Sequence, residues 1–186
     1  MKISDVFGDP PVGKKSPLPK PVSTGWTKKF IDELASKMAA EVGYRSGEAL
    51  EPIVNELGGK VFTGTVPETG STGYLEVEEG GEFLIALSPI PGTYRNNFTI
   101  AHELGHYFLH SKLGEKPLFA TRQAGDRAEW EANWFAAGFL MPAEEFVEEW
   151  KKADGSIGRL INRYQLSGGA IEIRKKTLEE LGYRFG

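Results

Sequence analysis

All three histidines of this chain lie within nine residues, in the run FTIAHELGHYFLH. Its core, HELGH, places His102 and His106 four residues apart, with Glu103 between them. Residues four apart on an α-helix share one face, so both imidazoles can point at a single metal ion. Zinc accepts imidazole nitrogens at about 2.0–2.1 Å. The spacing therefore predicts a helix that binds Zn²⁺, although imidazole and carboxylate ligands also accept other divalent ions such as Mn²⁺.

Glu103 follows His102 directly, one position round the predicted helix. Its carboxylate would lie near the open coordination position of the metal, where it can accept a proton from water as a general base. The chain contains no cysteine, which excludes disulfides, zinc–thiolate fingers and iron–sulfur clusters. Any metal site must use nitrogen and oxygen ligands, as open catalytic zinc sites commonly do.

Two histidines leave a catalytic zinc site one protein ligand short. His110 is the nearest candidate, but eight residues of helix rotate it by about 80° from His102, and we interpret it as a packing or helix-end residue. The next helical run, AEWEANWFAAGFLMP, carries Glu129 and Asn133 on one face. Glu129 can complete the ligand set while Asn133 hydrogen-bonds a ligand imidazole. Glu131, on the other side of that helix, is the alternative third ligand.

The hydrophobic pattern predicts an α+β chain with helices, then a small antiparallel or mixed sheet, then further helices. A helix is expected over 27–43 with Thr27 as its N-cap, and a shorter helix over 47–57. Short apolar runs separated by glycines predict three strands, at 60–66, 73–77 and 82–87. Helical spacing then recurs, at 97–113, 126–140, 142–152, 156–164 and 169–181.

Composition divides the chain into three regions. Residues 1–25 form a proline-rich basic tail, since residues 1–30 carry a charge of +4 while the whole chain carries −4. Residues 26–152 hold the metal motif, and 153–186 form a C-terminal helical segment that we expect to pack on the domain. No run approaches the roughly 18 apolar residues of a membrane span, and no apolar signal peptide is visible. Without disulfides, a cytoplasmic location is expected.

The chain resembles the ImmA/IrrE family of zinc metallopeptidases over residues 27–183. The resemblance rests on two motifs, RNNFTIAHELGH and EWEANWFAAGFLMP. It implies a zincin-like metallopeptidase domain over 26–152 and a gluzincin-type site. In that site His102, His106 and Glu129 bind zinc and Glu103 is the catalytic base, so the resemblance favours Glu129 over Glu131.

The resemblance also implies a function, because family members are typically cytoplasmic regulators that act against helix-turn-helix repressors. We expect a zinc endopeptidase that cleaves a cognate helix-turn-helix repressor or antitoxin in a phage, mobile element or stress response. The alternative is an anti-repressor module that binds its partner without proteolysis. In zincins a substrate can add as a strand to the edge of the sheet, and residues 82–87 are the expected edge.

Two further sets of residues have competing interpretations. Tyr94 and Arg95 are candidate donors to the oxyanion of the reaction, although a structural ion pair is the simpler interpretation of Arg95. The C-terminal segment is loosely helix-turn-helix in layout, and the basic run at 174–176 suggests DNA contact. Glutamates interrupt the same run, so we expect a helix pair packed on the domain and no direct DNA binding.

Overall fold

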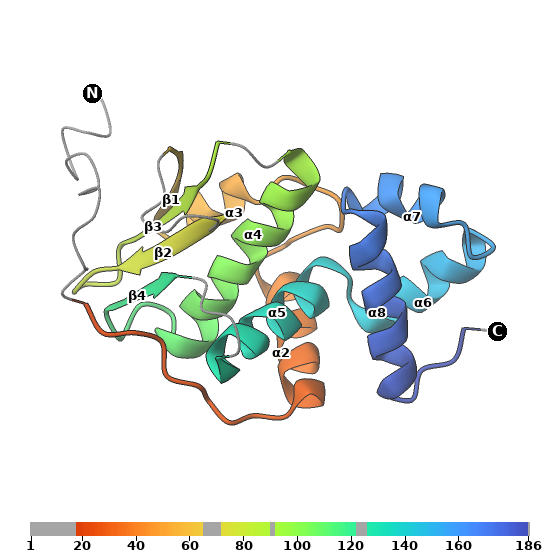
Figure 1. Cartoon of the computed structure of the whole chain (residues 1–186), viewed down its shortest axis with the longest axis horizontal. Coiled ribbons are helices and arrows are strands. Elements are labelled where there is room, and N and C mark those ends of the chain that lie inside the picture. The colour runs from red at the N-terminus through yellow and green to blue at the C-terminus, as the bar shows by residue number, and fades with distance from the viewer. Residues whose placement is uncertain (1–17, 65–71, 90–91, 122–125, 186) are drawn as a thin grey trace.

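The computed structural model describes residues 18–64, 72–89, 92–121 and 126–185 (Figure 1). The predicted basic tail therefore lies outside the described residues, apart from its last eight positions, 18–25. The described elements begin with α2 (Lys28–Glu41), α3 (Glu51–Glu56), β1 (Gly59–Thr63), β2 (Gly73–Val77) and β3 (Phe83–Leu87). They continue with α4 (Thr93–Gly105), a π-helical turn (His106–His110), β4 (Leu118–Thr121), α5 (Arg127–Leu140), α6 (Ala143–Lys152), α7 (Ile157–Tyr164) and α8 (Gly168–Glu180).

These elements confirm the α+β class. Helix α2 begins after Thr27, whose Oγ1 accepts a hydrogen bond from the backbone N–H of Phe30 at 3.2 Å, as the N-cap prediction requires. The helix predicted over 97–113 differs from the observed one in its bounds and in its form. Helix α4 begins at Thr93, and a π-helical turn continues it from His106 to His110. Strand β4 was not predicted, because its four residues, LFAT, are too few for a clear alternation.

The sheet is mixed, with strand order β1-β3-β2-β4. Strand β3 pairs in parallel with β1 and antiparallel with β2, so both of its edges are hydrogen-bonded. The expectation that residues 82–87 form the sheet edge is therefore wrong, and the edges are β1 and β4. The sequence FLIAL is continuously apolar and almost wholly buried, which is typical of a central strand. Strand β1, in contrast, is largely exposed or half-buried.

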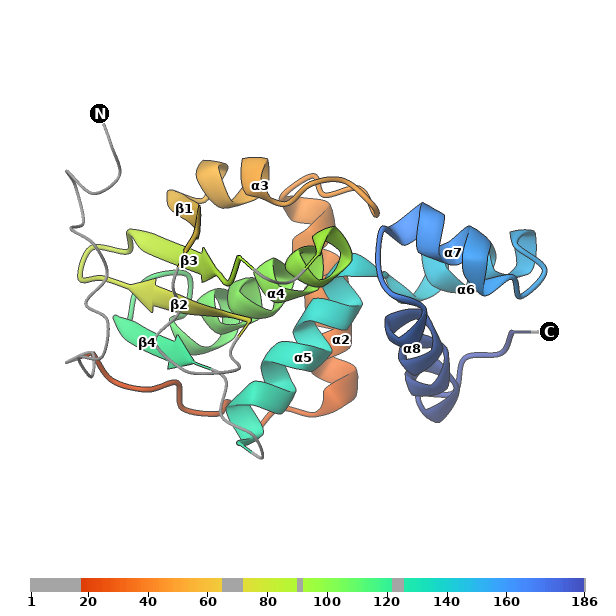
Figure 2. The same cartoon turned by 45° about the horizontal axis from the view of Figure 1, so that its top comes forward.

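Helix α4 lies against the sheet, α5 packs on α4, and α2 packs on α5 (Figures 1 and 2). Apolar residues of all these layers share one core, including Leu75, Ile85, Leu104, Phe135 and Phe139. The approach of α4 to α5 is close at Gly105, because a Cβ atom there would lie 3.1 Å from the Cα of Ala132. Glycine therefore lets the helix that carries the HELGH motif contact the helix that carries Glu129.

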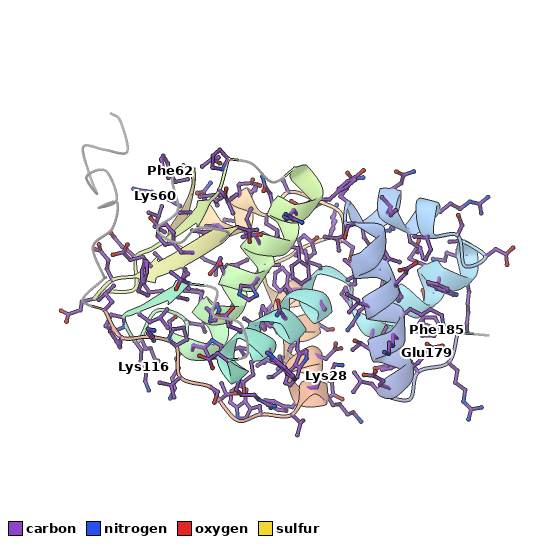
Figure 3. The ribbon with its side chains drawn as sticks, viewed as in Figure 1. Lys28, Lys60, Phe62, Lys116, Glu179 and Phe185 are labelled. Carbon is purple, nitrogen blue, oxygen red and sulfur yellow. The ribbon has the colours of Figure 1, made fainter. Side chains whose placement is uncertain are left out.

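Helices α6, α7 and α8 form the C-terminal part, seen to the right of the sheet and α4 in Figure 1. Arg174 of α8 is fully buried and forms an ion pair with Asp32 of α2, while its Nε donates to the carbonyl of Met141 at 2.9 Å. Lys175 is ion-paired with Glu179, which Figure 3 labels on α8. Arg174 thus packs α8 on α2, whereas Lys175 pairs within α8 and Lys176 is exposed, so the absence of direct DNA binding stays a prediction.

A second ion pair joins α2 to α8. Lys28, labelled on α2 in Figure 3, lies 3.1 Å from Glu180 at the end of α8. Contacts between α2 and α8 therefore join the two ends of the described chain. None of the helices in the described ranges is both long enough and apolar enough to cross a membrane. The division of the chain at 152/153 remains a prediction.

Candidate metal centre

The two histidines of the HELGH motif face one another at the C-terminal end of α4. His102 lies in the last turn of the helix and His106 opens the π-helical turn, and each is 1% exposed. Their Nε2 atoms are 3.2 Å apart. Because the π turn starts at His106 itself, the four-residue spacing within α4 is kept. The local helix thus presents two imidazole nitrogens to one point.

The third group at this point is Glu129, from the first turn of α5. Its Oε2 lies 3.2 Å from His102 Nε2, and its Oε1 lies 3.1 Å from His106 Nε2. Burial alone would raise the pKa of Glu129, but hydrogen bonds from the two histidines outweigh burial and lower that pKa to about 2. The Glu129 carboxylate is therefore ionised at neutral pH, as a metal ligand must be.

The donor set and its spacing fit a divalent metal ion. Tetrahedral coordination with bonds of about 2.0–2.1 Å places neighbouring ligand atoms about 3.3 Å apart. The separations here are 3.1–3.2 Å. Within the described part of the chain, this trio is the one group of at least three such side chains close enough to hold a metal ion. Two imidazoles and one carboxylate leave a fourth position for water or substrate.

Asn133 lies behind His102, one turn along α5 from Glu129. Its Oδ1 accepts a hydrogen bond from His102 Nδ1 at 3.0 Å. With its proton on Nδ1, a neutral imidazole has a lone pair on Nε2, which a metal ion would accept in place of the present hydrogen bond to Glu129. The structure therefore places Asn133 where the sequence suggested, on a ligand imidazole.

Glu103 is buried, with 1% of its surface exposed. It precedes His106 by three residues, so the two side chains are neighbours on the surface of α4. The polypeptide thus holds a carboxylate beside the cluster in a position that solvent hardly reaches. A carboxylate with this placement can receive a proton from a water held at the fourth coordination position.

His110 and Glu131 form a second layer on the other side of His106. His110 Nδ1 lies 2.9 Å from His106 Nδ1, and His110 Nε2 lies 3.2 Å from Glu131 Oε2. Burial, together with the neighbouring His106, lowers the pKa of His110 to about 4, so this imidazole is neutral at pH 7. The histidine interpreted as a packing residue is therefore part of a polar chain that ends at Glu131.

The structure settles the choice between Glu129 and Glu131 as neighbours of the histidine pair. The two residues are two positions apart on α5, so their side chains leave the helix about 160° apart. Only Glu129 contacts the facing Nε2 atoms, whereas Glu131 contacts His110 and the backbone at 24–25. The four-residue spacing of His106 and His110 was a signal for this contact, since residues four apart on a helix are neighbours.

A cleft of about 1190 Å³ is lined by residues of α2, α4, α5 and α8, and the three clustered side chains are not among them. Asn133 contributes to its wall, which links it to the metal-ligating side of α5. Tyr94 and Arg95 of α4 also line the cleft, and both are exposed. Among the residues that the structure describes, Arg95 has no ion-pair partner. These residues therefore do not support the interpretation of Arg95 as part of a structural ion pair. Both side chains remain candidates for contact with a substrate.

Comparisons with known proteins agree with this geometry. The family described as Peptidase M78, IrrE N-terminal-like domain, matches residues 56–176. Among solved structures, a protein titled "Mycobacterium tuberculosis transcriptional regulator" shares the fold, with a TM-score of 0.56 and 22% sequence identity over 76% of this chain. The alignment covers 45% of the length of that regulator. A search of curated proteins finds no match. Because the family match spans more than half of the chain, this protein belongs to the ImmA/IrrE family.

Proposed function

We propose that this protein is a zinc-dependent endopeptidase. The observation that carries the proposal is the convergence of His102 Nε2, His106 Nε2 and the Glu129 carboxylate within 3.2 Å of one another. The buried Glu103 carboxylate lies beside them on α4. Membership of a family named for a peptidase supports the same reaction class.

A divalent metal ion held by these three residues would lower the pKa of a coordinated water to about 7 and polarise the scissile carbonyl. Glu103 accepts the proton of the attacking water and later returns it to the leaving amine. By accepting from Nδ1, Asn133 favours the tautomer of His102 whose Nε2 can bind a metal ion. Tyr94 and Arg95, on the wall of the cleft, are the candidate donors of hydrogen bonds to a developing oxyanion.

The proposed substrate is a cognate helix-turn-helix transcriptional repressor or an antitoxin. This part of the proposal follows from the family resemblance and is supported by a structural neighbour that is titled a transcriptional regulator. The cleft is large enough for several side chains of a polypeptide, and both polar and apolar residues line it.

The test uses the purified full chain, loaded with Zn²⁺, and a candidate substrate, a helix-turn-helix protein encoded in a neighbouring reading frame. Glu103→Gln should retain zinc and lower the cleavage rate by about 10²–10⁴-fold, the usual contribution of general acid–base catalysis. Glu129→Gln should lose both zinc and cleavage, which separates a failure of chemistry from a failure of metal binding.

Two results would count against the proposal. Undiminished cleavage by Glu103→Gln would remove this carboxylate from the mechanism. Tight binding of the repressor by the zinc-loaded wild type, with no cleavage of the complex, would instead identify the protein as an anti-repressor binding module.

A further inference from the structure

An extended segment, residues 18–26, lies outside the regular elements and crosses β4 and α5 before α2 begins (Figures 1 and 2). We name it the strap. At its start, the carbonyl of Pro19 accepts a hydrogen bond from the backbone N–H of Phe119 in β4 at 2.9 Å. At its end, the carbonyl of Trp26 accepts from Arg127 of α5 at 2.6 Å. The strap is therefore anchored at both ends to elements of the domain.

Between these anchors the strap contacts Glu131. The backbone N–H groups of Thr24 and Gly25 donate to the two Glu131 oxygens at 2.8 and 3.0 Å, and the Thr24 hydroxyl donates at 2.9 Å. Arg127 Nε adds a fourth donor at 3.1 Å, and His110 Nε2 is the fifth polar atom, at 3.2 Å. The Glu131 side chain is fully buried, so its ionised form depends on these partners.

The protons along this chain have one consistent arrangement. For His106 to bind a metal ion through Nε2, its proton must lie on Nδ1, which then donates to His110 Nδ1. His110 must therefore carry its own proton on Nε2, and this N–H donates to Glu131. Glu131 is a suitable end to the chain because a carboxylate only accepts hydrogen bonds. The strap thus contacts the group that fixes the tautomer of a metal ligand.

We propose that the strap is a working part of the metal centre, because it holds Glu131, which orients His110 and so presents His106 Nε2 to the metal. Glu131 and His110 are positioning residues in this proposal. The inference rests on the proposed metal site, but it concerns metal affinity and not the substrate. Partners behind a ligand imidazole commonly change metal affinity by about 10- to 100-fold.

Glutamine is an informative replacement at two positions. In Glu131→Gln the amide NH₂ must face at least one of the surrounding donors, so the carboxylate cannot be replaced without loss. In His110→Gln, by contrast, the amide oxygen can accept from His106 and the NH₂ group can donate to Glu131. The hydrogen bonds therefore predict that glutamine weakens zinc binding at position 131 and largely preserves it at position 110.

The experiment measures the dissociation constant of Zn²⁺ for the full chain by competition with a chelating indicator. Glu131→Gln and His110→Leu should weaken zinc binding by about 10- to 100-fold, whereas His110→Gln should recover most of the loss. Glu145→Gln is the matched control, because Glu145 also accepts hydrogen bonds from two side chains, those of Ser46 and Arg163, far from the metal ligands in the sequence. Its zinc affinity should be that of the wild type.

The strap itself is tested with Gly25→Ala. Gly25 has a φ of +73°, and no atom lies within 4 Å of the position that a Cβ would take, so alanine changes only the backbone preference. The left-handed conformation disfavours alanine, and zinc affinity should fall by up to about 30-fold. The visible spectrum of bound Co²⁺, which reports ligand geometry, should change in the Glu131 and His110 variants.

If docking of the strap strengthens zinc binding, zinc binding must equally stabilise the docked strap. Zn²⁺ should therefore slow hydrogen exchange of the Thr24 and Gly25 amides in the wild type. It should have no such effect in Glu131→Gln. Equal zinc affinity in the wild type, Glu131→Gln, His110→Leu and Gly25→Ala would overturn the inference while leaving the proposed peptidase intact. Failure of the wild type to bind zinc at all would overturn both. Loss of affinity in Glu145→Gln as well would show that general destabilisation, and not the strap, sets the affinity.

Discussion

Gly105→Ala is the change that most directly tests how the metal centre is assembled. Gly105 ends α4, one residue before His106, and it faces α5 at Ala132, three residues after Glu129. A Cβ atom there would lie 3.1 Å from both the Cα and the carbonyl oxygen of Ala132, and 3.3 Å from the Cβ of Phe135. These neighbours are backbone or Cβ atoms, so no side-chain rotation can make room.

The size of the effect follows from these distances. An ordinary contact of a Cβ atom begins at about 3.4 Å, so α4 and α5 must separate locally by a few tenths of an ångström. Metal–ligand distances tolerate only about ±0.2 Å, and Glu129 moves with α5. We therefore expect zinc affinity to fall by about 10- to 100-fold, or about 1.4–2.8 kcal/mol. Overpacking costs about 1–3 kcal/mol of stability, but the better helix propensity of alanine returns about 1 kcal/mol.

The assay pairs zinc titration with urea unfolding of the metal-free protein. Gly158→Ala is the control, because Gly158 lies in α7 and nothing comes within 4 Å of the position of its Cβ. This control should match the wild type in zinc affinity and should be as stable or slightly more stable. Wild-type zinc affinity in Gly105→Ala would refute the conclusion that close contact between α4 and α5 sets the ligand geometry.

Three further changes have expected outcomes. Arg174→Met should lower the free energy of unfolding by about 3–5 kcal/mol in urea, because it leaves the buried Asp32 carboxylate without its partner; adding Asp32→Leu should recover part of this loss. Stability of the metal-free protein should fall as the pH drops from 6.5 to 4, since unfolded chains protonate His110 near 6.5 but the folded chain does so only near 4. This proton linkage amounts to roughly 3 kcal/mol, and His110→Gln should flatten the profile. Asn133→Leu should weaken zinc binding by about 10- to 100-fold, because the Nδ1–H of His102 loses its acceptor.

The parts of the site that lie within single helices could be predicted from the sequence. The spacing of His102 and His106, and of Glu129 and Asn133, is set by the helical period, and a helix keeps that period wherever it packs. The N-cap at Thr27 is local in the same sense. Family resemblance supplied the remaining choice, that of Glu129 over Glu131, because the period alone cannot say which face of α5 meets α4.

Features that depend on contacts between distant segments could not be predicted in this way. The pairing of β1 with β3, which moves residues 82–87 from the edge to the interior of the sheet, joins strands some twenty residues apart. The π-helical turn at His106–His110 was not predicted, because the run HYFLH has the same spacing of apolar residues as an ordinary α-helix. The contact between Thr24 and Glu131 spans 107 residues, and no local pattern encodes it.

Helix α5 reaches both ring nitrogens of His106 through its two glutamates. Glu129 contacts the Nε2 atom of His106 directly at 3.1 Å, and Glu131 reaches the Nδ1 atom of the same imidazole through His110. A spacing of two residues sends the side chains to opposite sides of α5, so a single helix controls both nitrogens of one ligand. Such an arrangement works only if α4 and α5 keep a fixed separation, which the contact between Gly105 and Ala132 provides. We therefore expect the glycine of HELGH to contribute to metal binding through this contact, although it offers no ligand itself.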